Sequence, residues 1–328
     1  MFKIKEIFLG EAIKKRRLEL GLTQEKLCSG ICEPITISRL ENGKQTPSRR
    51  TLNALLNRLD MPNDKYYALL TVKELKIEEI WDKINACNVN FNKASKENRS
   101  KIREEAINLH NELIKNTGID DNLLNQYIIR SQMIIGKSDC SYILDEQYEF
   151  LLKAIKITSP NFDIDDINKC IYSFEEIKTI RQLAIIHIYK EEHMEAIGIL
   201  SQLYKYIKNH FHKTIIIQSN LNMIIYNYAN ELCIIGQYAK SLELAKEGRK
   251  LALRSGNYQL LPETIALMAE CYHFLGDDNE SKEFFYQAYY LMKTTENESN
   301  LDNLIKDAQQ LLNINLAHPL YQQHDKAI

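Results

Sequence analysis

Apolar residues recur at intervals of three and four along most of the chain, which is the spacing of one face of an α-helix. Near the N-terminus this spacing is interrupted by residues that cap helices, such as Gly21, Thr23 and Gly43. With only 11 glycines and 6 prolines in 328 residues, the chain has few turn residues for a many-stranded sheet. The pattern predicts an all-α protein, beginning with helices over residues 10–20, 24–29, 34–41 and 48–59.

Charge is distributed unevenly between this first segment and the remaining chain. Residues 1–60 contain 12 Lys/Arg and 7 Asp/Glu, a net charge of +5, whereas the remainder has a net charge of −7. A small basic module that contains two short helices joined by a tight turn is typical of helix-turn-helix proteins that bind DNA. We therefore expect a DNA-binding domain over residues 1–62, a connecting helix over 63–86 and a separate body over 87–328.

Three short motifs within the module match a known family in both order and spacing. They are Leu22-Thr23-Gln24-Glu25-Lys26-Leu27, Ile37-Ser38-Arg39-Leu40-Glu41-Asn42-Gly43 and Thr46-Pro47-Ser48. With these motifs the segment resembles the lambda-repressor-like (Xre) DNA-binding domains. The resemblance implies a buried ion pair between Arg17 and Glu41, and a third helix that reads the major groove of double-stranded DNA.

Helical spacing and the resemblance together give a candidate DNA-binding set. Ile37 and Leu40 should face inward onto Leu27 and Ile31, which leaves Ile35, Ser38 and Arg39 on the outer face. The resemblance implies base contacts from the start and middle of this helix and a phosphate contact from Gln24, while the other cations are either phosphate contacts or simple solvated charges. The complete set is Gln24, Pro34, Ile35, Thr36, Ser38, Arg39, Lys44, Arg49 and Arg50.

The start of the third helix departs from the polar residues that many relatives have there. In place of Gln or Ser it has Glu33-Pro34-Ile35, which is poorly suited to direct hydrogen-bond readout. Ile35 could contact a thymine methyl group instead, and Glu33 could either repel phosphate or accept a hydrogen bond from cytosine N4.

The body of the chain contains pairs of predicted helices that resemble degenerate tetratricopeptide repeats. In the clearest unit, Tyr226-Asn227-Tyr228-Ala229 precedes Gly236-Gln237-Tyr238, with small residues further on where two helices would cross closely. Turns at 136, 191, 236 and 276, together with a first pair near 77–115, give about five repeats. Such repeats form a superhelix whose inner surface can hold an extended peptide.

The repeat template selects the side chains that should line this inner surface. Asn227 and Asn230 lie one turn apart, and each amide offers the donor and the acceptor needed to hold a peptide backbone. The predicted peptide-binding set is Gln126, Arg130, Arg181, Gln182, His187, Tyr226, Asn227, Asn230 and Glu270.

An Xre-type domain followed by such repeats resembles the Rgg, PlcR and PrgX group of quorum-sensing receptors. In PlcR-like members an Asn in a Tyr-Asn-x-Ala segment grips the peptide, which implies that role for Asn227. A second such Asn corresponds here to His187, or to Gln182 or Ile185 if the alignment shifts. The resemblance implies a cytoplasmic homodimer that binds an inverted repeat and responds to a short signalling peptide.

Two other functions remain open at this point: a repeat-containing adaptor that inhibits a partner protein, and a regulator that binds no peptide. Pro34 and Ile35 slightly favour the adaptor, whereas the basic module favours DNA binding. No catalytic motif, Gly-rich phosphate loop or metal-ligand spacing occurs, so we expect neither an enzyme nor a cofactor or metal site. Seven scattered cysteines indicate reduced thiols, and no apolar run is long enough to span a membrane.

Overall fold

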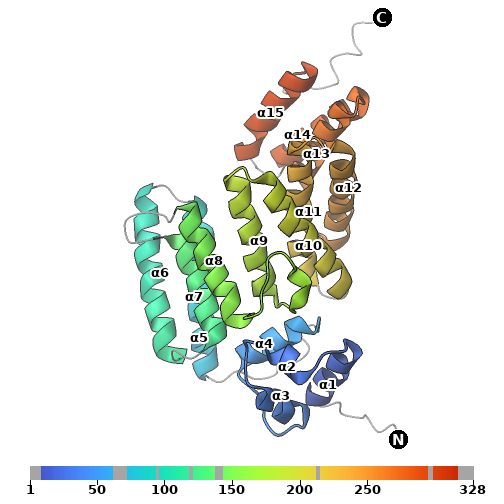
Figure 1. Cartoon of the computed structure of the whole chain (residues 1–328). Helices are drawn as coiled ribbons and strands as arrows, with labels where there is room; N and C mark the ends of the chain where they lie inside the picture. Colours follow the sequence, from blue (N-terminus) through green and yellow to red (C-terminus); the bar gives the residue numbers. More distant parts are fainter. Residues whose placement is uncertain are drawn as a thin grey trace, which may run out of the picture. The chain divides into compact units, whose positions relative to one another are not determined.

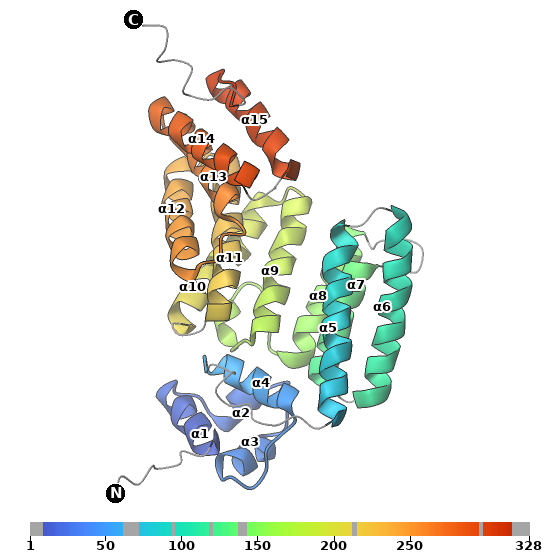
Figure 2. The same cartoon turned by 180° about the vertical axis from the view of Figure 1, so that it is seen from behind.

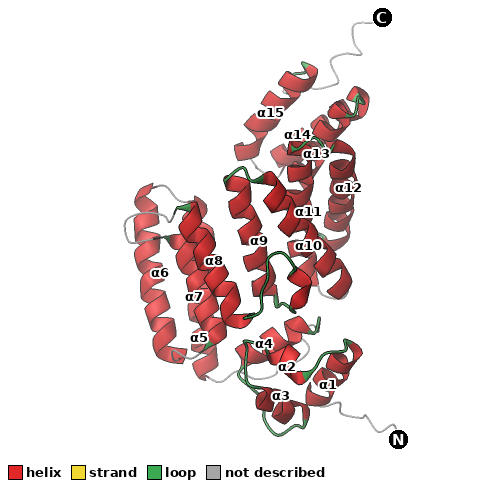
Figure 3. Ribbon diagram, viewed as in Figure 1, coloured by secondary structure: helices red, strands yellow, loops and turns green. Residues whose placement is uncertain are grey.

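The structure is a computed structural model that describes residues 9–61, 72–93, 96–117, 121–136, 143–211, 215–294 and 298–316. All the regular secondary structure in these ranges is helical, as predicted (Figures 1 and 3). The helices are α1 (Leu9–Glu19), α2 (Gln24–Cys28), α3 (Pro34–Glu41), α4 (Arg49–Arg58), α5 (Val72–Lys93), α6 (Lys96–Thr117), α7 (Asn122–Ile135), α8 (Leu144–Thr158), the 3-10 turn η2 (Ile167–Lys169), α9 (Phe174–Tyr189), α10 (His193–His210), α11 (Ile215–Ile234), α12 (Tyr238–Ser255), α13 (Leu261–Phe274), α14 (Asp278–Thr294) and α15 (Glu298–Leu312).

The chain divides into two compact units, which we describe separately. The first comprises Met1–Glu191 with Lys208–Thr214, and the second comprises Glu192–Ile207 with Ile215–Ile328. The first unit therefore contains both the predicted DNA-binding domain and the first repeat helices. Within the described residues, no helix is long and apolar enough to cross a membrane.

The helices α1–α4 form a small domain whose ends are fixed by local sequence. Thr23 caps α2 by accepting a hydrogen bond from the Lys26 amide (3.1 Å), and Ser48 caps α4 through the Thr51 amide (3.3 Å). Pro34 occupies the first turn of α3, where its missing N–H costs no intrahelical bond. The core of this domain consists of completely or nearly completely buried aliphatic residues: Ile13, Leu27, Ile37, Leu40, Leu52, Leu55, Leu56 and Leu59.

One glycine of this domain permits a close approach to the repeat helices. Gly30 has a φ of +70°, and a Cβ atom built on it would lie 2.0 Å from the carbonyl oxygen of Thr158 at the end of α8. The Gly30 carbonyl also accepts a hydrogen bond from the Asn122 side chain at the start of α7 (2.9 Å). Only glycine fits this position without displacing the backbone of α8.

Helices α5–α8 lie side by side in both views of the first unit (Figures 1 and 2). The pairs α5/α6 and α7/α8 each pack together, with Ile84, Leu113 and Leu124 fully buried in their core. The first repeat pair predicted near 77–115 is thus formed by α5 and α6. The predicted connecting segment 63–86 lies partly outside the described residues, and its described end belongs to α5.

In the second unit, α11/α12 and α13/α14 form consecutive helix pairs, and α15 packs on α14. The small residues Ala229, Ala245, Ala269 and Ala288 of these helices are fully buried. Gly248 is equally constrained, because a Cβ atom there would lie 3.1 Å from Ile225. The four predicted turn positions, Gly136 and Glu191 in the first unit and Gly236 and Gly276 in the second, all have positive φ angles, between 60° and 87°.

Candidate DNA-binding surface and peptide-binding helices

Helix α3, which is predicted to read DNA, is oriented by the core that it shares with α2. Ile37 and Leu40 are at most 3% exposed, as the helical spacing predicts, and they pack in the same cluster as Leu27. The opposite side of α3 carries Ile35, which is 55% exposed, and Arg39, which is also exposed. An exposed aliphatic group and an exposed guanidinium on one helix are suited to contact base edges in a major groove.

The other predicted base-contacting positions are less accessible than Arg39. Pro34, Thr36 and Ser38 are half-buried, and the Ser38 carbonyl accepts a hydrogen bond from the Asn42 side chain (2.7 Å). Among the described residues, the guanidinium of Arg39 hydrogen-bonds only to the Gln45 side chain, at 3.4 Å, in an exposed position. Arg39 is therefore the polar group on this face that can most readily change partner.

A buried ion pair stabilises the arrangement of α1, α2 and α3. Arg17 donates to Glu41 through Nε (2.6 Å) and Nη2 (2.9 Å), and to the Leu22 carbonyl through Nη1 (2.8 Å). The Gln24 amide also donates to Glu41 (2.8 Å). Burial alone would raise the pKa of Glu41, but the hydrogen bonds from Arg17 and Gln24 outweigh it and lower this pKa. The predicted ion pair is present, while the Gln24 amide expected at a phosphate is held by Glu41.

The three predicted cations after α3 differ in their surroundings. Lys44 is exposed, and Arg49 is half-buried in the first turn of α4. Arg50 instead points toward the repeat helices: its guanidinium is 2.8 Å from Asp121, the N-cap residue of α7, and 5.1 Å from the centre of the Trp81 ring. The phosphate contact of Arg50 stays a prediction, and it would require this ion pair with Asp121 to open.

A second arginine joins the DNA-binding domain to the repeat helices, and the sequence did not indicate it. Arg58, at the end of α4, donates to the carbonyls of Leu27 (2.9 Å) and Ser29 (2.8 Å). Its other terminal nitrogen donates to the Thr158 carbonyl (3.1 Å) and to Glu176 in the first turn of α9 (3.0 Å). The side chains of Arg58 and Glu176 are each only 1% exposed.

Glu176 has hydrogen-bond partners at both of its oxygens. Oε1 accepts from the hydroxyls of Thr158 (2.8 Å) and Ser159 (2.7 Å), and Oε2 accepts from the Ser173 backbone amide (2.6 Å). Burial would raise the pKa of Glu176, but the charge of Arg58 and these donors lower it instead. The group is therefore a carboxylate whose two oxygens both have donors, although the buried Nε atom of Arg58 has no hydrogen-bond partner among the described residues.

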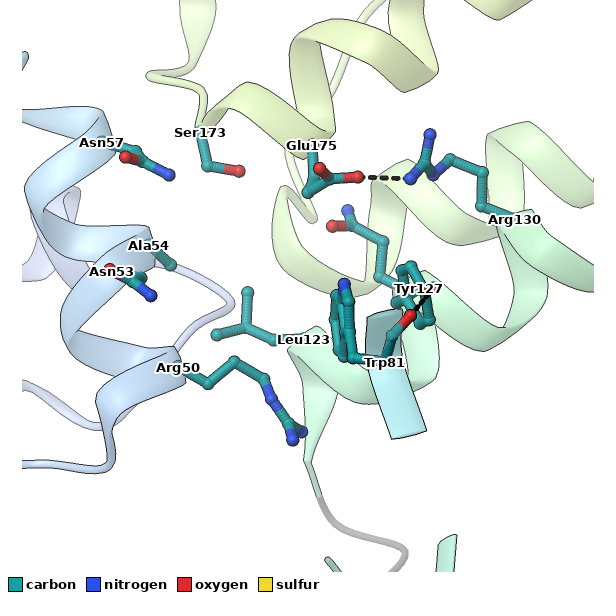
Figure 4. Close-up of a pocket in the computed structure, with 11 residues that line it drawn as sticks. Arg50, Asn53, Ala54, Asn57, Trp81, Leu123, Tyr127, Arg130, Ser173 and Glu175 are labelled. Atoms are coloured by element: carbon teal, nitrogen blue, oxygen red, sulfur yellow. Dashed lines mark hydrogen bonds and ion pairs between the residues drawn. The ribbon is translucent and has the colours of Figure 1, made fainter. Parts of the chain in front are cut away.

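Beside this network, α4 and the repeat helices enclose a cavity of about 190 Å³. Asn53 and Asn57 of α4 point toward it, opposite Trp81, Leu123 and Glu175 (Figure 4). The Trp81 and Tyr127 rings, 3.6 Å apart, stack on one side. The contact between the two domains is thus polar and incompletely packed around its buried ion pair.

Two of the predicted peptide-binding residues are already bonded within the first unit. Gln126 is 2% exposed, and its amide donates to the Ala154 carbonyl and the Thr158 hydroxyl, so it supports the Glu176 network. Arg130 forms an ion pair with Glu175, near the start of α9. The Gln126 amide is buried in this network, and its contact with a peptide stays a prediction.

The other predicted positions of α9 are half-buried. Arg181 and Gln182 lie next to each other, and neither has a hydrogen-bond partner for its buried side-chain atoms Nε and Oε1 among the described residues. His187 packs edge-on against Tyr148, with 5.2 Å between the ring centres.

In the second unit, α11 presents its two predicted asparagines on its half-exposed side. Asn227 and Asn230 are half-buried, while Tyr228 and Ala229 between them are buried in the packing of the helices. No described residue hydrogen-bonds to either amide. Both amides are therefore available to a ligand such as an extended peptide.

Acidic groups of α13 and α15 lie close to the Tyr226 side of α11. Burial, together with the charges of Glu263 and Glu270, raises the pKa of Tyr226 to about 12. Burial and the charge of Asp307 raise the pKa of Glu270 to about 7. Among the described residues, no group of His, Cys, Asp and Glu side chains could hold a metal ion, and their cysteines are free thiols.

Comparisons with known proteins give a family match for the N-terminal domain and structural matches for most of the chain. Residues 13–62 match the helix-turn-helix family model, and a comparison with curated protein sequences finds no match. The crystal structure of Bacillus thuringiensis PlcR with the peptide PapR7 and DNA is 18% identical, with a TM-score of 0.52 over 91% of this chain and 99% of PlcR. Apo PlcR gives 18% identity and a TM-score of 0.53 over 91% and 98%. The chain thus combines an N-terminal DNA-binding domain of the helix-turn-helix family with helix-pair repeats, in the fold that PlcR has.

Proposed function

We propose that this protein is a transcription regulator whose DNA binding is switched by a short signalling peptide bound to its repeat helices. The observation that carries the proposal is the buried contact between the two parts: Arg58 of the DNA-binding domain ends on Glu176 of α9. A rearrangement of the repeat helices would therefore act directly on the orientation of the recognition helix. The similarity to PlcR, whose crystal structure includes a peptide and DNA, supports the same function.

The residues that we propose for DNA recognition are the exposed Ile35, Arg39 and Lys44, together with the half-buried Arg49. Arg39 reads a base edge and Ile35 contacts a thymine methyl group, whereas Lys44, Arg49 and the backbone at the start of α2 contact phosphates. One recognition helix reads too few base pairs for specificity. We therefore propose a cytoplasmic homodimer on an inverted repeat, with half-sites one or more helical turns apart.

For the peptide, we propose that the amides of Asn227 and Asn230 pair with its backbone N–H and C=O groups, beside Tyr226 and Glu270. A peptide alters DNA binding only if it prefers one conformation of the protein over another. Because such coupling is reciprocal, operator DNA must change peptide affinity by the same factor as peptide changes DNA affinity. We therefore propose quorum sensing as the biological role of this protein.

The experiment is a reciprocal binding measurement on the full-length protein. A genomic operator is first selected from random DNA, and synthetic peptides are made from short secreted reading frames beside the gene. Gel-shift titrations with and without peptide, and peptide anisotropy titrations with and without operator, should give equal coupling factors. Specific DNA binding that no peptide changes would favour a regulator without a peptide ligand, and the absence of specific DNA binding would favour an adaptor.

A further inference from the structure

The cavity of about 190 Å³ in the first unit has no part in the function proposed above. Along one wall, α4 turns the side chains of Asn53 and Asn57, which are one helical turn apart, toward the open space (Figure 4). The opposite wall contains the Leu123 side chain and the Trp81 ring, which stacks on Tyr127. The cavity thus combines an aromatic and aliphatic wall with neutral hydrogen-bonding groups, which is the usual lining of a small-molecule site.

The amide of Asn53 lacks a hydrogen-bond partner among the described residues. Its Oδ1 atom is buried and accepts no hydrogen bond from any of them. A buried amide normally finds its partners within the protein, in ordered water or in a ligand. Because Asn53 lines the cavity, a molecule that occupies the cavity can supply the missing partner.

The charged groups around the cavity are already compensated. At one end Arg50 pairs with Asp121 (2.8 Å), and its guanidinium lies 5.1 Å from the centre of the Trp81 ring. At the other end Arg130 pairs with Glu175. A charged ligand would have to break one of these pairs or remain without a counter-charge, which is costly in a partly dry cavity. The surroundings therefore favour a neutral, flat molecule that offers a donor and an acceptor to an amide.

We infer that this cavity binds a purine base, either free or as its nucleoside. An asparagine amide matches the neighbouring donor and acceptor on one edge of a purine, and aromatic side chains pack against the fused rings. The volume is adequate, since a cavity of about 150 Å³ already holds benzene. A bound base would contact both α4 and the repeat helices, so it would stabilise their packed arrangement. The site goes beyond the proposed function, because it requires neither the peptide nor Asn227.

Trp81 reports on this cavity directly, because it is the only tryptophan of the chain. Adenine, hypoxanthine, adenosine and AMP are titrated into the full-length protein after nucleic acid has been removed, and binding is followed by Trp81 fluorescence and calorimetry. Benzimidazole is the control ligand, since it has the same fused rings without the exocyclic group of these purines. The variants are Asn53→Leu, which keeps the size without the amide, and Leu123→Phe, which places a larger side chain in the cavity. Asn108→Ala, at an exposed asparagine of α6, is the control variant.

At least one of the purines should quench Trp81 fluorescence, and Asn53→Leu should bind it about tenfold to a hundredfold more weakly than the wild type. Leu123→Phe should abolish binding, and Asn108→Ala should bind as the wild type does. Benzimidazole should bind at least about tenfold more weakly than the best purine, because it lacks the edge that pairs with an amide. AMP should bind more weakly than adenosine, because the arginines of the cavity are already paired. Without ligand, Asn53→Leu should melt no lower than the wild type.

Four results would overturn the inference. They are the failure of all four purines to bind, wild-type affinity in both Asn53→Leu and Leu123→Phe, benzimidazole that binds as tightly as the best purine, and AMP that binds more tightly than adenosine. A lower melting temperature of unliganded Asn53→Leu would show a structural role for this amide and would also overturn the inference. None of these measurements involves a peptide. Their failure therefore leaves the peptide receptor intact, and a failure of every peptide leaves the purine site intact.

Discussion

Arg58 and Glu176, 118 positions apart in the sequence, form an ion pair of 3.0 Å in which each side chain is only 1% exposed. The pair lies where the last helix of the DNA-binding domain meets the first turn of α9. Around it, backbone carbonyls of the DNA-binding domain accept from Arg58, and hydroxyls of the α8–α9 segment donate to Glu176. Loss of one partner therefore leaves a buried charge without compensation.

Arg58→Met should destabilise the first unit by about 3–5 kcal/mol, because Glu176 would remain buried without its counter-charge. Glu176→Gln should cost less than Arg58→Met, since a neutral amide still accepts from Ser159 and Thr158. In the double variant the cost should be smaller than the sum of the two single costs. Urea denaturation measures these differences. Additive costs would show that the two side chains do not act as a pair.

Gly30→Ala should separate the DNA-binding domain from α8, because the new Cβ atom would lie 2.0 Å from the Thr158 carbonyl oxygen. Limited proteolysis should then cleave between the domain and the repeats at a lower protease concentration than in the wild type. Gly21→Ala is the matched control. Gly21 has a similar φ of +66°, but a Cβ atom there would meet no neighbour within 4 Å. Equal protease sensitivity of Gly30→Ala and Gly21→Ala would show that backbone strain alone causes the effect.

Arg39→Ala should weaken binding to the specific operator by about 1–3 kcal/mol and leave random DNA almost unaffected. Lys44→Ala should weaken both DNAs alike and reduce the slope of affinity against salt by about one unit. Arg50→Ala should leave that slope unchanged, because Arg50 is paired with Asp121. Gel-shift titrations at several salt concentrations distinguish the three variants. A changed slope for Arg50→Ala would restore it as a phosphate contact.

Asn227→Ala should weaken peptide binding by about 1–3 kcal/mol, since peptide backbone groups would lose their partner in a partly dry groove. Binding to DNA without peptide should not change. Anisotropy titrations with a labelled peptide provide the measurement. Asn303→Ala, an exposed asparagine on α15, is the control. Peptide affinity that is unchanged in both Asn227→Ala and Asn230→Ala would place the peptide elsewhere.

The free energy of unfolding of the second unit should decrease as the pH rises from about 5 to about 7, because Glu270 loses its proton in this range. The pKa of Glu270 is raised to about 7 in the folded protein. Its contribution to the free energy of unfolding is therefore fully present below the pKa of the unfolded chain, and it is lost as the pH rises through the pKa of the folded protein. Glu270→Gln should therefore be more stable than the wild type at pH 8, by up to about 3 kcal/mol, and similar to it at pH 4. Asp307→Asn should reduce the pH dependence, because it removes the neighbouring charge. Thermal unfolding across this range tests the sign.

The sequence by itself determined the helices and the DNA-binding domain, because their signals are local. Thr23 and Ser48 cap helices through amides three residues away, and the spacing of Ile37 and Leu40 selects the buried face of α3. The turn positions of the repeats were also predictable, since a glycine marks three of the four, at 136, 236 and 276. The half-buried placement of Asn227 and Asn230 agrees with the repeat template.

Only the tertiary structure decided which polar side chains are already bonded within the protein. Arg50 and Asp121 are 71 positions apart, and Gln126 donates to a hydroxyl 32 positions later. Nothing in local spacing distinguishes them from Arg39 or Asn227, which remain accessible. The same holds for Arg130, which has a carboxylate partner, and Arg181, whose Nε atom has no partner in the described part of the chain. The partner of a long polar side chain depends on which helices the fold brings together, and that packing is set by the whole hydrophobic core.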